Sequence, residues 1–332
     1  MAKSKQPQQH ASPRRVLDAK QFNRRLTLQC GRQVSYAEVG DPRGFPVICL
    51  LGMRGHRYHS YLYNNLAHNH SIRLFCIDRP GYGLSDHVAS SSLPHPIAFV
   101  YIVEQFLTFL RIERFGLMAQ SAGCIYALAI AAQPSLATRL VQPIMLVAPW
   151  VGIDNPGTLG LLKVAAFCPT ALISAGIKLM DVSTDLSCLS ASPNYILAAM
   201  STRKDHAYAH FYAPADETPV PFHEFQQRVQ AEPNNVLQDA ILCLGKCRTG
   251  FRFDQVDVHV HVFHGRKDSL VPLRAAQEFV AKLPHADLDV IEDGNHMILF
   301  DEDVMEAVFD AMAAATVASL TPRESDVSGH SI

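Results

Sequence analysis

Short apolar runs separated by longer helical patterns recur along most of the chain. Near the start, residues 26–30 and 34–38 alternate apolar and polar positions around a Gly-Arg turn, which predicts an antiparallel hairpin at a sheet edge. The later runs are almost continuously apolar, as expected for parallel strands that helices cover on both faces. These runs lie at residues 47–51, 72–77, 115–118, 144–148, 258–263 and 288–291.

Helical patterns lie between most of these predicted strands. They cover residues 97–110, 122–132, 273–283 and 303–315. Such an alternation predicts an α/β protein with a mostly parallel, doubly wound sheet, here of eight strands. In sheets of this kind, ligands bind beyond the carboxyl ends of the strands.

The alternation stops between residues 150 and 250, where helical stretches, prolines and the aromatic-rich segment 206–212 follow without a clear strand. This pattern predicts a helical cap inserted into the α/β core. The expected organisation is a flexible leader, a core in two pieces that flank the cap, and a flexible tail. The boundaries are 1–22 for the leader, 23–149 and 251–316 for the core, 150–250 for the cap and 317–332 for the tail.

Composition restricts the possible partners and the compartment. Of 332 residues, 29 are basic and 31 acidic, so the net charge of −2 does not favour nucleic acid or an anionic membrane, and a small, weakly charged substrate is expected. The polar N-terminus lacks the apolar stretch of a secretory signal, and no uninterrupted apolar run of about 18 residues occurs. The eight cysteines are scattered, mostly inside apolar runs, and are expected to be buried free thiols. These features predict a cytoplasmic protein without a membrane span, and they leave its oligomeric state open.

The segment Ala119-Gln120-Ser121-Ala122-Gly123 lies between an apolar strand and an alanine-rich helix. It is a variant of the nucleophile elbow G-x-S-x-G, in which a strand turns so sharply into a helix that the serine is held exposed at the sheet edge. Small residues are needed two positions before and after the serine, where the turn approaches neighbouring backbone. A serine that only caps the helix would have the same local sequence.

A serine nucleophile requires a general base and a group that orients the base. Asp268 follows the strand predicted at 258–263, and His296 follows the strand predicted at 288–291. Serine, acid and histidine thus occur in the order that hydrolases with a nucleophile elbow use, each just beyond a strand. The sequence therefore predicts a triad of Ser121, Asp268 and His296.

Residues 26–316 resemble the α/β-hydrolase superfamily. The likeness rests on the elbow, on Asp78-Arg79-Pro80-Gly81-Tyr82-Gly83-Leu84-Ser85, and on His264-Gly265-x-x-Asp268. It implies a serine hydrolase without a cofactor that cleaves an ester, thioester or lactone of a small, largely apolar molecule. The cap and the cytoplasmic character are similar to those of small-molecule hydrolases, including some of fungal secondary metabolism.

The resemblance also assigns an oxyanion hole, made by the backbone N–H groups of Ala122 and Met53. Asp154, in the loop after the sixth strand, is the alternative triad acid because some similar enzymes draw the acid from there. A serine at position 121 argues against the epoxide-hydrolase and dehalogenase branches, which attack with a carboxylate.

Two positions depart from the family pattern: Leu51 replaces a histidine that commonly braces the oxyanion loop, and Ala119 replaces a glycine. These departures keep open a ligand-binding or receptor-like homologue with little or no catalysis. A lyase or acyltransferase would use the same triad, and an interaction scaffold would have a collapsed pocket.

Other groups of chemically versatile residues are expected to be structural. His259, His261 and His264 lie on or beside one strand, but no carboxylate stands at a spacing that completes a metal site. Cys243 and Cys247 lie one helical turn apart, which packing explains. No metal is therefore predicted. Asp78 and Arg79 are expected to brace loops, and the cap aromatics Tyr208, Phe211 and Tyr212 either line a pocket or pack the cap.

Overall fold

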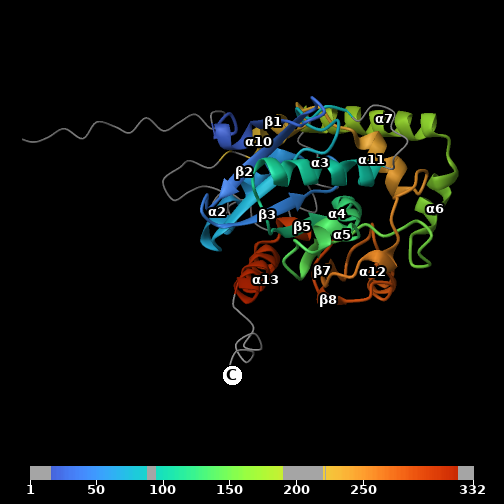
Figure 1. The fold of residues 1–332 in the computed structure, drawn as a ribbon. Coiled ribbons are helices and arrows are strands. Elements are labelled where there is room, and N and C mark those ends of the chain that lie inside the picture. Colours follow the sequence, from blue (N-terminus) through green and yellow to red (C-terminus); the bar gives the residue numbers. More distant parts are fainter. Residues whose placement is uncertain (1–15, 88–94, 190–219, 221, 321–332) are drawn as a thin grey trace, which may run out of the picture.

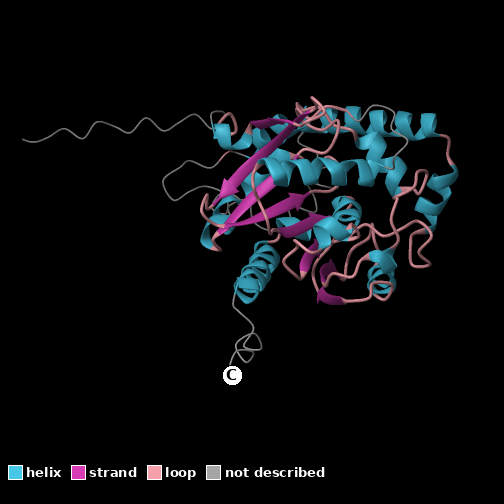
Figure 2. Ribbon diagram, viewed as in Figure 1, coloured by secondary structure: helices cyan, strands magenta, loops and turns pink. Residues whose placement is uncertain are grey.

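An eight-stranded, mostly parallel sheet forms the centre of the protein (Figures 1 and 2). The computed structural model describes residues 16–87, 95–189, 220 and 222–320. The strands are β1 (Arg24–Thr27), β2 (Gln33–Gly40), β3 (Phe45–Leu50), β4 (Ile72–Ile77), β5 (Gly116–Gln120), β6 (Ile144–Val147), β7 (Val260–Gly265) and β8 (Ala286–Ile291). Their order in the sheet is β1-β2-β4-β3-β5-β6-β7-β8. The pairs β1–β2 and β2–β4 are antiparallel, and the other neighbouring pairs are parallel.

Helices connect the strands and cover the sheet. The α-helices described are α2 (Asn64–Asn69), α3 (His95–Phe109), α4 (Gly123–Ala131), α5 (Pro134–Ala137), α6 (Gly160–Phe167), α7 (Thr170–Leu189), α10 (Phe222–Gln230), α11 (Val236–Cys243), α12 (Leu273–Val280) and α13 (Glu302–Leu320). Short 3₁₀ helices are η1 (Lys20–Phe22), η2 (Arg57–Tyr63), η3 (Phe253–Gln255) and η4 (Ile298–Phe300).

The central strands are apolar on both faces because each face packs against its own helices. On β3, Ile48 and Leu50 join the core cluster that includes α3 and α4, while Val47 and Cys49 join the cluster that includes η2, α2 and α13. Side chains of a strand alternate between the two faces, so this division follows directly from the chain geometry. It explains why the sequence shows continuous apolar runs instead of alternation.

The strand order places a crevice beside β3. The chain runs from β3 to its neighbour β4, crosses back through α3, and continues at β5 on the other side of β3. The connections after β3 and β5 therefore leave the sheet next to each other but lead in opposite directions. Ligand sites of doubly wound sheets lie at such a switch in direction.

The fold class and all the strands predicted from the sequence are confirmed, with end points that differ by a few residues. Four connections contain helices that the sequence pattern did not indicate: η2 and α2 between β3 and β4, the four-residue α5 after α4, η3 before β7, and η4 after β8. Pro134 stops α4 as expected, but it also begins α5, since proline suits the first position of a helix.

Residues near both ends of the described chain differ from the expected boundaries. Leu17 and Phe22 are buried at 3% and 1% exposure, so residues within the predicted leader of 1–22 belong to the core. Two isolated apolar residues show no period, and only their tertiary contacts reveal that they are core residues. At the other end, α13 continues to Leu320 instead of ending at 316.

The described part of the segment between β6 and β7 is helical, with α6, α7, α10 and α11, and no strand is described there. The aromatic residues Tyr208, Phe211 and Tyr212 lie outside the described residues. Within the described chain, no helix is both long and apolar enough to cross a membrane. The seven described cysteines are free thiols; four of them are buried, but Cys30 is exposed, contrary to expectation.

Candidate active site

The turn from β5 into α4 holds Ser121 in a strained conformation. Its φ is +50°, in the left-handed region that residues with a side chain rarely adopt. The Ser121 N–H donates to the Val147 carbonyl at 3.1 Å, and the Ser121 carbonyl accepts from Trp150 N–H at 3.1 Å. These long-range hydrogen bonds hold the strained residue in place, as expected for a functional turn.

Gly123 allows this turn to approach β3. A Cβ at this position would lie 2.3 Å from the Leu50 carbonyl oxygen and 2.6 Å from that of Leu51. The requirement for a small residue two positions after the serine therefore has a direct steric cause. Ala119, at the matching position before the serine, is fully buried and pairs with Leu50 in the sheet, so its extra methyl is accommodated.

The structure brings Ser121, His296 and Asp268 together in one hydrogen-bonded chain. His296 Nε2 lies 2.9 Å from Ser121 Oγ, and His296 Nδ1 lies 2.7 Å from Asp268 Oδ2. The Asp268 side chain is buried, and its other oxygen accepts the N–H groups of Leu270 and Val271, both at 2.8 Å. These two backbone hydrogen bonds hold the carboxylate so that its second oxygen faces the imidazole. Asp154, the alternative acid, is exposed, and the hydrogen bond from Nδ1 goes to Asp268.

A second histidine lies beside the acid. The buried His264 places Nε2 2.9 Å from the Val271 carbonyl oxygen and 3.6 Å from Asp268 Oδ2. Burial lowers the pKa of His264, which outweighs the opposing effects of the Val271 carbonyl and the Asp268 carboxylate. A neutral His264 does not compete with His296 for the Asp268 charge. The sequence indicated His264 as a residue on or beside a strand and as part of the motif His264-Gly265-x-x-Asp268, but not that its ring would lie beside the Asp268 carboxylate.

The loop after β3 lies against the elbow. The Gly52 carbonyl accepts from Gly55 N–H at 3.0 Å, which closes a turn with Arg54 at φ +66°. The Gly52 N–H donates to Gln120 Oε1 at 3.0 Å. A Cβ on Gly52 would lie 2.8 Å from Ser121 Cβ and 3.3 Å from Ser121 Oγ, so the glycine permits the close approach.

The two residues predicted to form the oxyanion hole belong to the two segments that approach each other here, Met53 to the loop after β3 and Ala122 to the elbow. Met53 is the first central residue of the Gly52–Gly55 turn, and its side chain is partly exposed. Ala122 follows Ser121, is buried, and stands at the N-terminus of α4. The Gly52 N–H is already hydrogen-bonded to Gln120, so the next backbone N–H along the loop, that of Met53, is the candidate oxyanion donor. Gln120 itself was not singled out from the sequence, although its position before the nucleophile was a signal.

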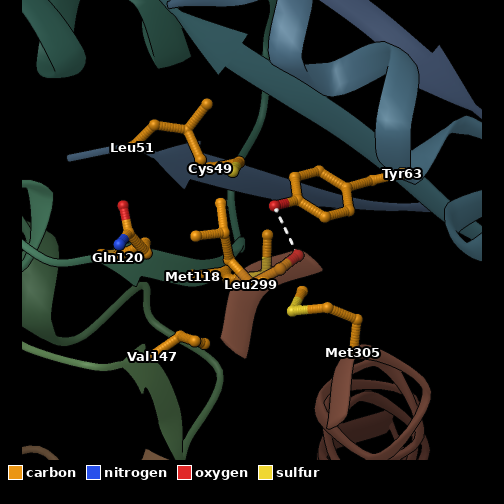
Figure 3. A pocket seen from close by; sticks show the side chains of 9 residues that line it. Cys49, Leu51, Tyr63, Met118, Gln120, Val147, Leu299 and Met305 are labelled. Atoms are coloured by element: carbon orange, nitrogen blue, oxygen red, sulfur yellow. Dashed lines mark hydrogen bonds between the residues drawn. The ribbon is translucent and has the colours of Figure 1, made fainter. Parts of the chain in front are cut away.

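A small cavity lies beside the elbow (Figure 3). Nearly all of its lining is apolar, and it includes Leu51 and Gln120 but neither Ser121 nor His296. The Tyr63 hydroxyl donates to the Leu299 carbonyl at 3.3 Å across one side of it. The remaining lining residues are Cys49, Met118, Ala119, Val147 and Met305. The hydrogen bond between Tyr63 and Leu299 anchors η4, the 3₁₀ helix that follows His296.

The strand histidines pair with carboxylates of the neighbouring strand. His259 Nε2 lies 2.8 Å from Asp287 Oδ2, and His261 Nε2 lies 2.9 Å from Asp289 Oδ2. The sequence suggested no carboxylate partner because the acids come from β8, about 28 positions later. Each pair accounts for its histidine without a metal.

One further set of possible metal ligands occurs among the described residues. His70 Nε2 lies 3.4 Å from Glu306 and 3.1 Å from Asp310, and both acids are exposed. The Nδ1 atom of His70 lies 2.8 Å from the Leu66 carbonyl. Contacts of one imidazole with two surface carboxylates account for this arrangement, which shares no residue with the candidate active site.

Comparison with known proteins defines the class. The sequence profile of the alpha/beta hydrolase family matches residues 47–311, and the protein belongs to this family. No curated protein sequence matches the chain significantly. Membership of the family supports a hydrolase function in general.

Solved structures with the same fold include several esterases. A thermophilic esterase from Thermogutta terrifontis is 16% identical, with a TM-score of 0.57 over 88% of this chain and 98% of its own. An esterase from Exiguobacterium antarcticum is 15% identical, with a TM-score of 0.59 over 88% and 99%. An alpha/beta hydrolase fold protein from Nakamurella multipartita is 16% identical, with a TM-score of 0.60 over 88% and 98%. At these identities the likeness establishes the fold.

Proposed function

We propose that the protein is a serine hydrolase that cleaves an ester, thioester or lactone of a small, largely apolar molecule through an acyl-enzyme. The observation that carries this proposal is the continuous hydrogen-bonded chain from Ser121 through His296 to Asp268, with distances of 2.9 and 2.7 Å. A serine that only capped α4 would need neither the histidine nor the buried acid beyond it.

The first step is attack of Ser121 Oγ on the substrate carbonyl carbon. With its Nδ1–H donated to Asp268, His296 presents the lone pair of Nε2 to the serine hydroxyl and takes its proton as the C–O bond forms. Asp268 stabilises the resulting imidazolium and keeps it in the required orientation. His296 then gives this proton to the leaving group, and the acyl group remains on Ser121.

The negative charge that develops on the carbonyl oxygen requires donors beside the serine. We assign the backbone N–H groups of Met53 and Ala122 to this role. Leu51 in place of the family's histidine removes no donor, since both donors are backbone groups. Water then attacks the acyl carbon as His296 takes its proton; the acyl–Oγ bond breaks, His296 returns the proton to Ser121 Oγ, and the acid is released.

The helices between β6 and β7 are proposed to form a cap over this site. Support comes from the buried contact of α11 with the loop after β4, where Asp239 lies 2.6 Å from Arg79. An insertion joined to the core at the crevice is suited to enclose a small substrate. A weakly charged substrate is favoured because the net charge of the protein is only −2.

Labelling of the intact protein with a small fluorophosphonate tests the proposal. The wild type is expected to gain one adduct by intact mass, while Ser121→Ala and His296→Ala gain none. Ser135→Ala, which removes an exposed serine, is the matched control and is expected to label like the wild type. Circular dichroism of each variant verifies that it is folded.

The same experiment separates the rival functions. A folded wild type that gains no adduct would overturn the hydrolase proposal in favour of a ligand-binding homologue. A labelled wild type that releases no acid from esters, thioesters or lactones, but transfers the acyl group to an alcohol or amine, would be an acyltransferase. Identification of the product by mass therefore distinguishes a hydrolase, which releases the free acid, from an acyltransferase, which forms a new ester or amide.

A further inference from the structure

The guanidinium of Arg79 holds the loop that follows β3. Arg79 is 2% exposed and stands two residues beyond β4, the neighbour of β3 in the sheet. Its Nη1 donates to the Leu51 carbonyl, and its Nη2 donates to the Gly52 carbonyl at 2.9 Å. One rigid, planar cation therefore contacts two successive peptide groups of the proposed oxyanion loop.

These two contacts fix the directions of two amide N–H groups. The Leu51 carbonyl belongs to the same planar peptide as the Gly52 N–H, and the Gly52 carbonyl belongs to the same peptide as the Met53 N–H. In a trans peptide, the C=O and N–H bonds point in opposite directions. The Gly52 N–H is directed to Gln120 Oε1 at 3.0 Å, and holding the Gly52 carbonyl sets the direction of the Met53 N–H.

Arg79 is itself held by a buried polar cluster. Asp239 on α11 accepts from Arg79 Nη2 at 2.6 Å, and it also accepts from the hydroxyls of Tyr82 at 2.5 Å and Tyr126 at 3.2 Å. The guanidinium carbon lies 4.7 Å from the centre of the Tyr82 ring and 5.1 Å from that of Tyr126. The two rings and the carboxylate together restrain the orientation of the guanidinium.

The charge of Arg79 persists in this buried place. Burial by itself lowers the pKa of Arg79, but the adjacent carboxylate of Asp239 raises it, with smaller contributions from Tyr82 and Tyr126, and the net pKa lies above its ordinary value. Burial, followed by the charge of Asp239, raises the pKa values of the Tyr82 and Tyr126 hydroxyls. Both tyrosines therefore remain hydrogen-bond donors to Asp239 across the pH range in which the protein would work.

We infer that Arg79, held by Asp239 of α11, is the positioning residue of the oxyanion hole and fixes the Met53 N–H in place of the family's histidine. The inference rests on the proposed hydrolase function. It also couples the segment between β6 and β7 to the catalytic machinery, because Asp239 comes from that segment. A shift of α11 would displace the Arg79 side chain and, with it, the Met53 amide.

Steady-state kinetics on a chromogenic ester, such as a p-nitrophenyl ester, test this inference with Arg79→Lys, Asp239→Asn and Tyr82→Phe. The number of reactive serines is first titrated with the fluorophosphonate, so that kcat is expressed per labelled site. Arg57→Lys is the matched control: Arg57 is as deeply buried and bonds to Asp78 at 2.9 Å and Glu232 at 2.8 Å, but to no carbonyl of the oxyanion loop.

Arg79→Lys and Asp239→Asn are expected to lower kcat per site by about 10- to 100-fold, since a donor is displaced instead of removed. KM is expected to stay within about a factor of three, because an oxyanion contact acts mainly in the transition state. Tyr82→Phe is expected to lower kcat by about 2- to 5-fold, as one of three donors to Asp239 is lost. Arg57→Lys should reduce stability but leave kcat per site unchanged.

The outcomes separate this inference from the proposed function. An unlabelled, inactive wild type would overturn both. A labelled, active wild type whose Arg79→Lys and Asp239→Asn variants keep the full kcat per site would overturn the inference alone. A loss confined to the number of labelled sites, equal in the Arg57→Lys control, would also overturn it, because it would show only a structural role. If Arg79→Lys does not fold, Asp239→Asn and Tyr82→Phe decide.

Discussion

Ion pairs at two places in this protein have similar distances but very different surroundings. Beside the active site, Arg79 and Asp239 lie 2.6 Å apart, with side chains only 3% and 1% exposed. At the β7–β8 edge, Arg266 lies 2.5 Å from Glu292 and Lys267 lies 2.6 Å from Asp293, and all four side chains are at least half exposed. Water screens the edge pairs, whereas the buried pair has only protein groups to compensate its charges. Distance alone is therefore a poor guide to what an ion pair does for the fold.

The largest expected effect comes from breaking the buried pair. Asp239→Ala should lower the free energy of unfolding by about 3–5 kcal/mol, because it leaves the Arg79 charge buried without its partner. Urea unfolding at pH 7, followed by circular dichroism, measures the change. The double variant Arg79→Met/Asp239→Leu should recover most of this stability, since it removes both charges, but it should not recover kcat. A double variant that regained activity would show that the pair serves stability alone.

The second effect concerns activity. Gly52→Ala should lower kcat by about 10²- to 10³-fold, comparable with the loss of an oxyanion donor. The new Cβ would lie 2.5 Å from Gln120 Oε1 and 2.8 Å from Ser121 Cβ, so the loop must move away from the nucleophile. Gly176→Ala is the control, because a Cβ there meets no atom within 4 Å. Ester hydrolysis by both variants measures the difference, and equal activities would contradict the proposed closeness of loop and serine.

The third effect is a loss of stability in acid that originates at two histidines at the start of η2, His56 and His59. Burial lowers the pKa of His56 to about 4 and that of His59 to about 3, so both are neutral in the folded protein. Below pH 6.5 the unfolded chain binds protons that the folded protein does not, and stability falls as the pH falls from about 6.5 toward 4. Each histidine should contribute about 1–2 kcal/mol of this loss between pH 7 and 5.

His56→Asn tests the assignment of the pH dependence. Asparagine can still accept the Tyr58 N–H at the start of η2, which His56 accepts in the wild type. Urea midpoints at pH 7 and pH 5 should differ less in the variant than in the wild type. An unchanged difference would assign the pH dependence to other groups.

The smallest effect is expected at the exposed edge. Arg266→Gln should leave the urea midpoint unchanged within error, since Arg266 and Glu292 are 51% and 69% exposed. Thermal unfolding at low and high salt measures any remaining contribution. If Arg266→Gln clearly lowers the stability of the protein at both salt concentrations, the distinction between screened surface pairs and the buried Arg79–Asp239 pair is wrong.

Much of the fold could be predicted because its signals are local. The continuous apolar runs of β3 to β7 reflect burial on both faces, and the strand-turn-helix sequence around Ser121 reflects a steric need for small residues. The positions of Asp268 and His296 just beyond two strands followed from the same periodicity. η2 was not predicted, because it is a 3₁₀ helix with nearly all its residues buried and has no helical apolar period.

By itself, the sequence determined the strands, the elbow and the order of serine, acid and histidine, since neighbouring residues encode these features. Three contacts could be seen only in the tertiary structure. Gln120 accepts a hydrogen bond from the Gly52 N–H, and His261 bonds to the Asp289 carboxylate. Arg79 bonds to the carboxylate of Asp239, 160 positions away. The physical reason is that such contacts depend on the order of strands in the sheet and on the return of α11 to the crevice. No period along the chain encodes either, because both result from packing between distant segments.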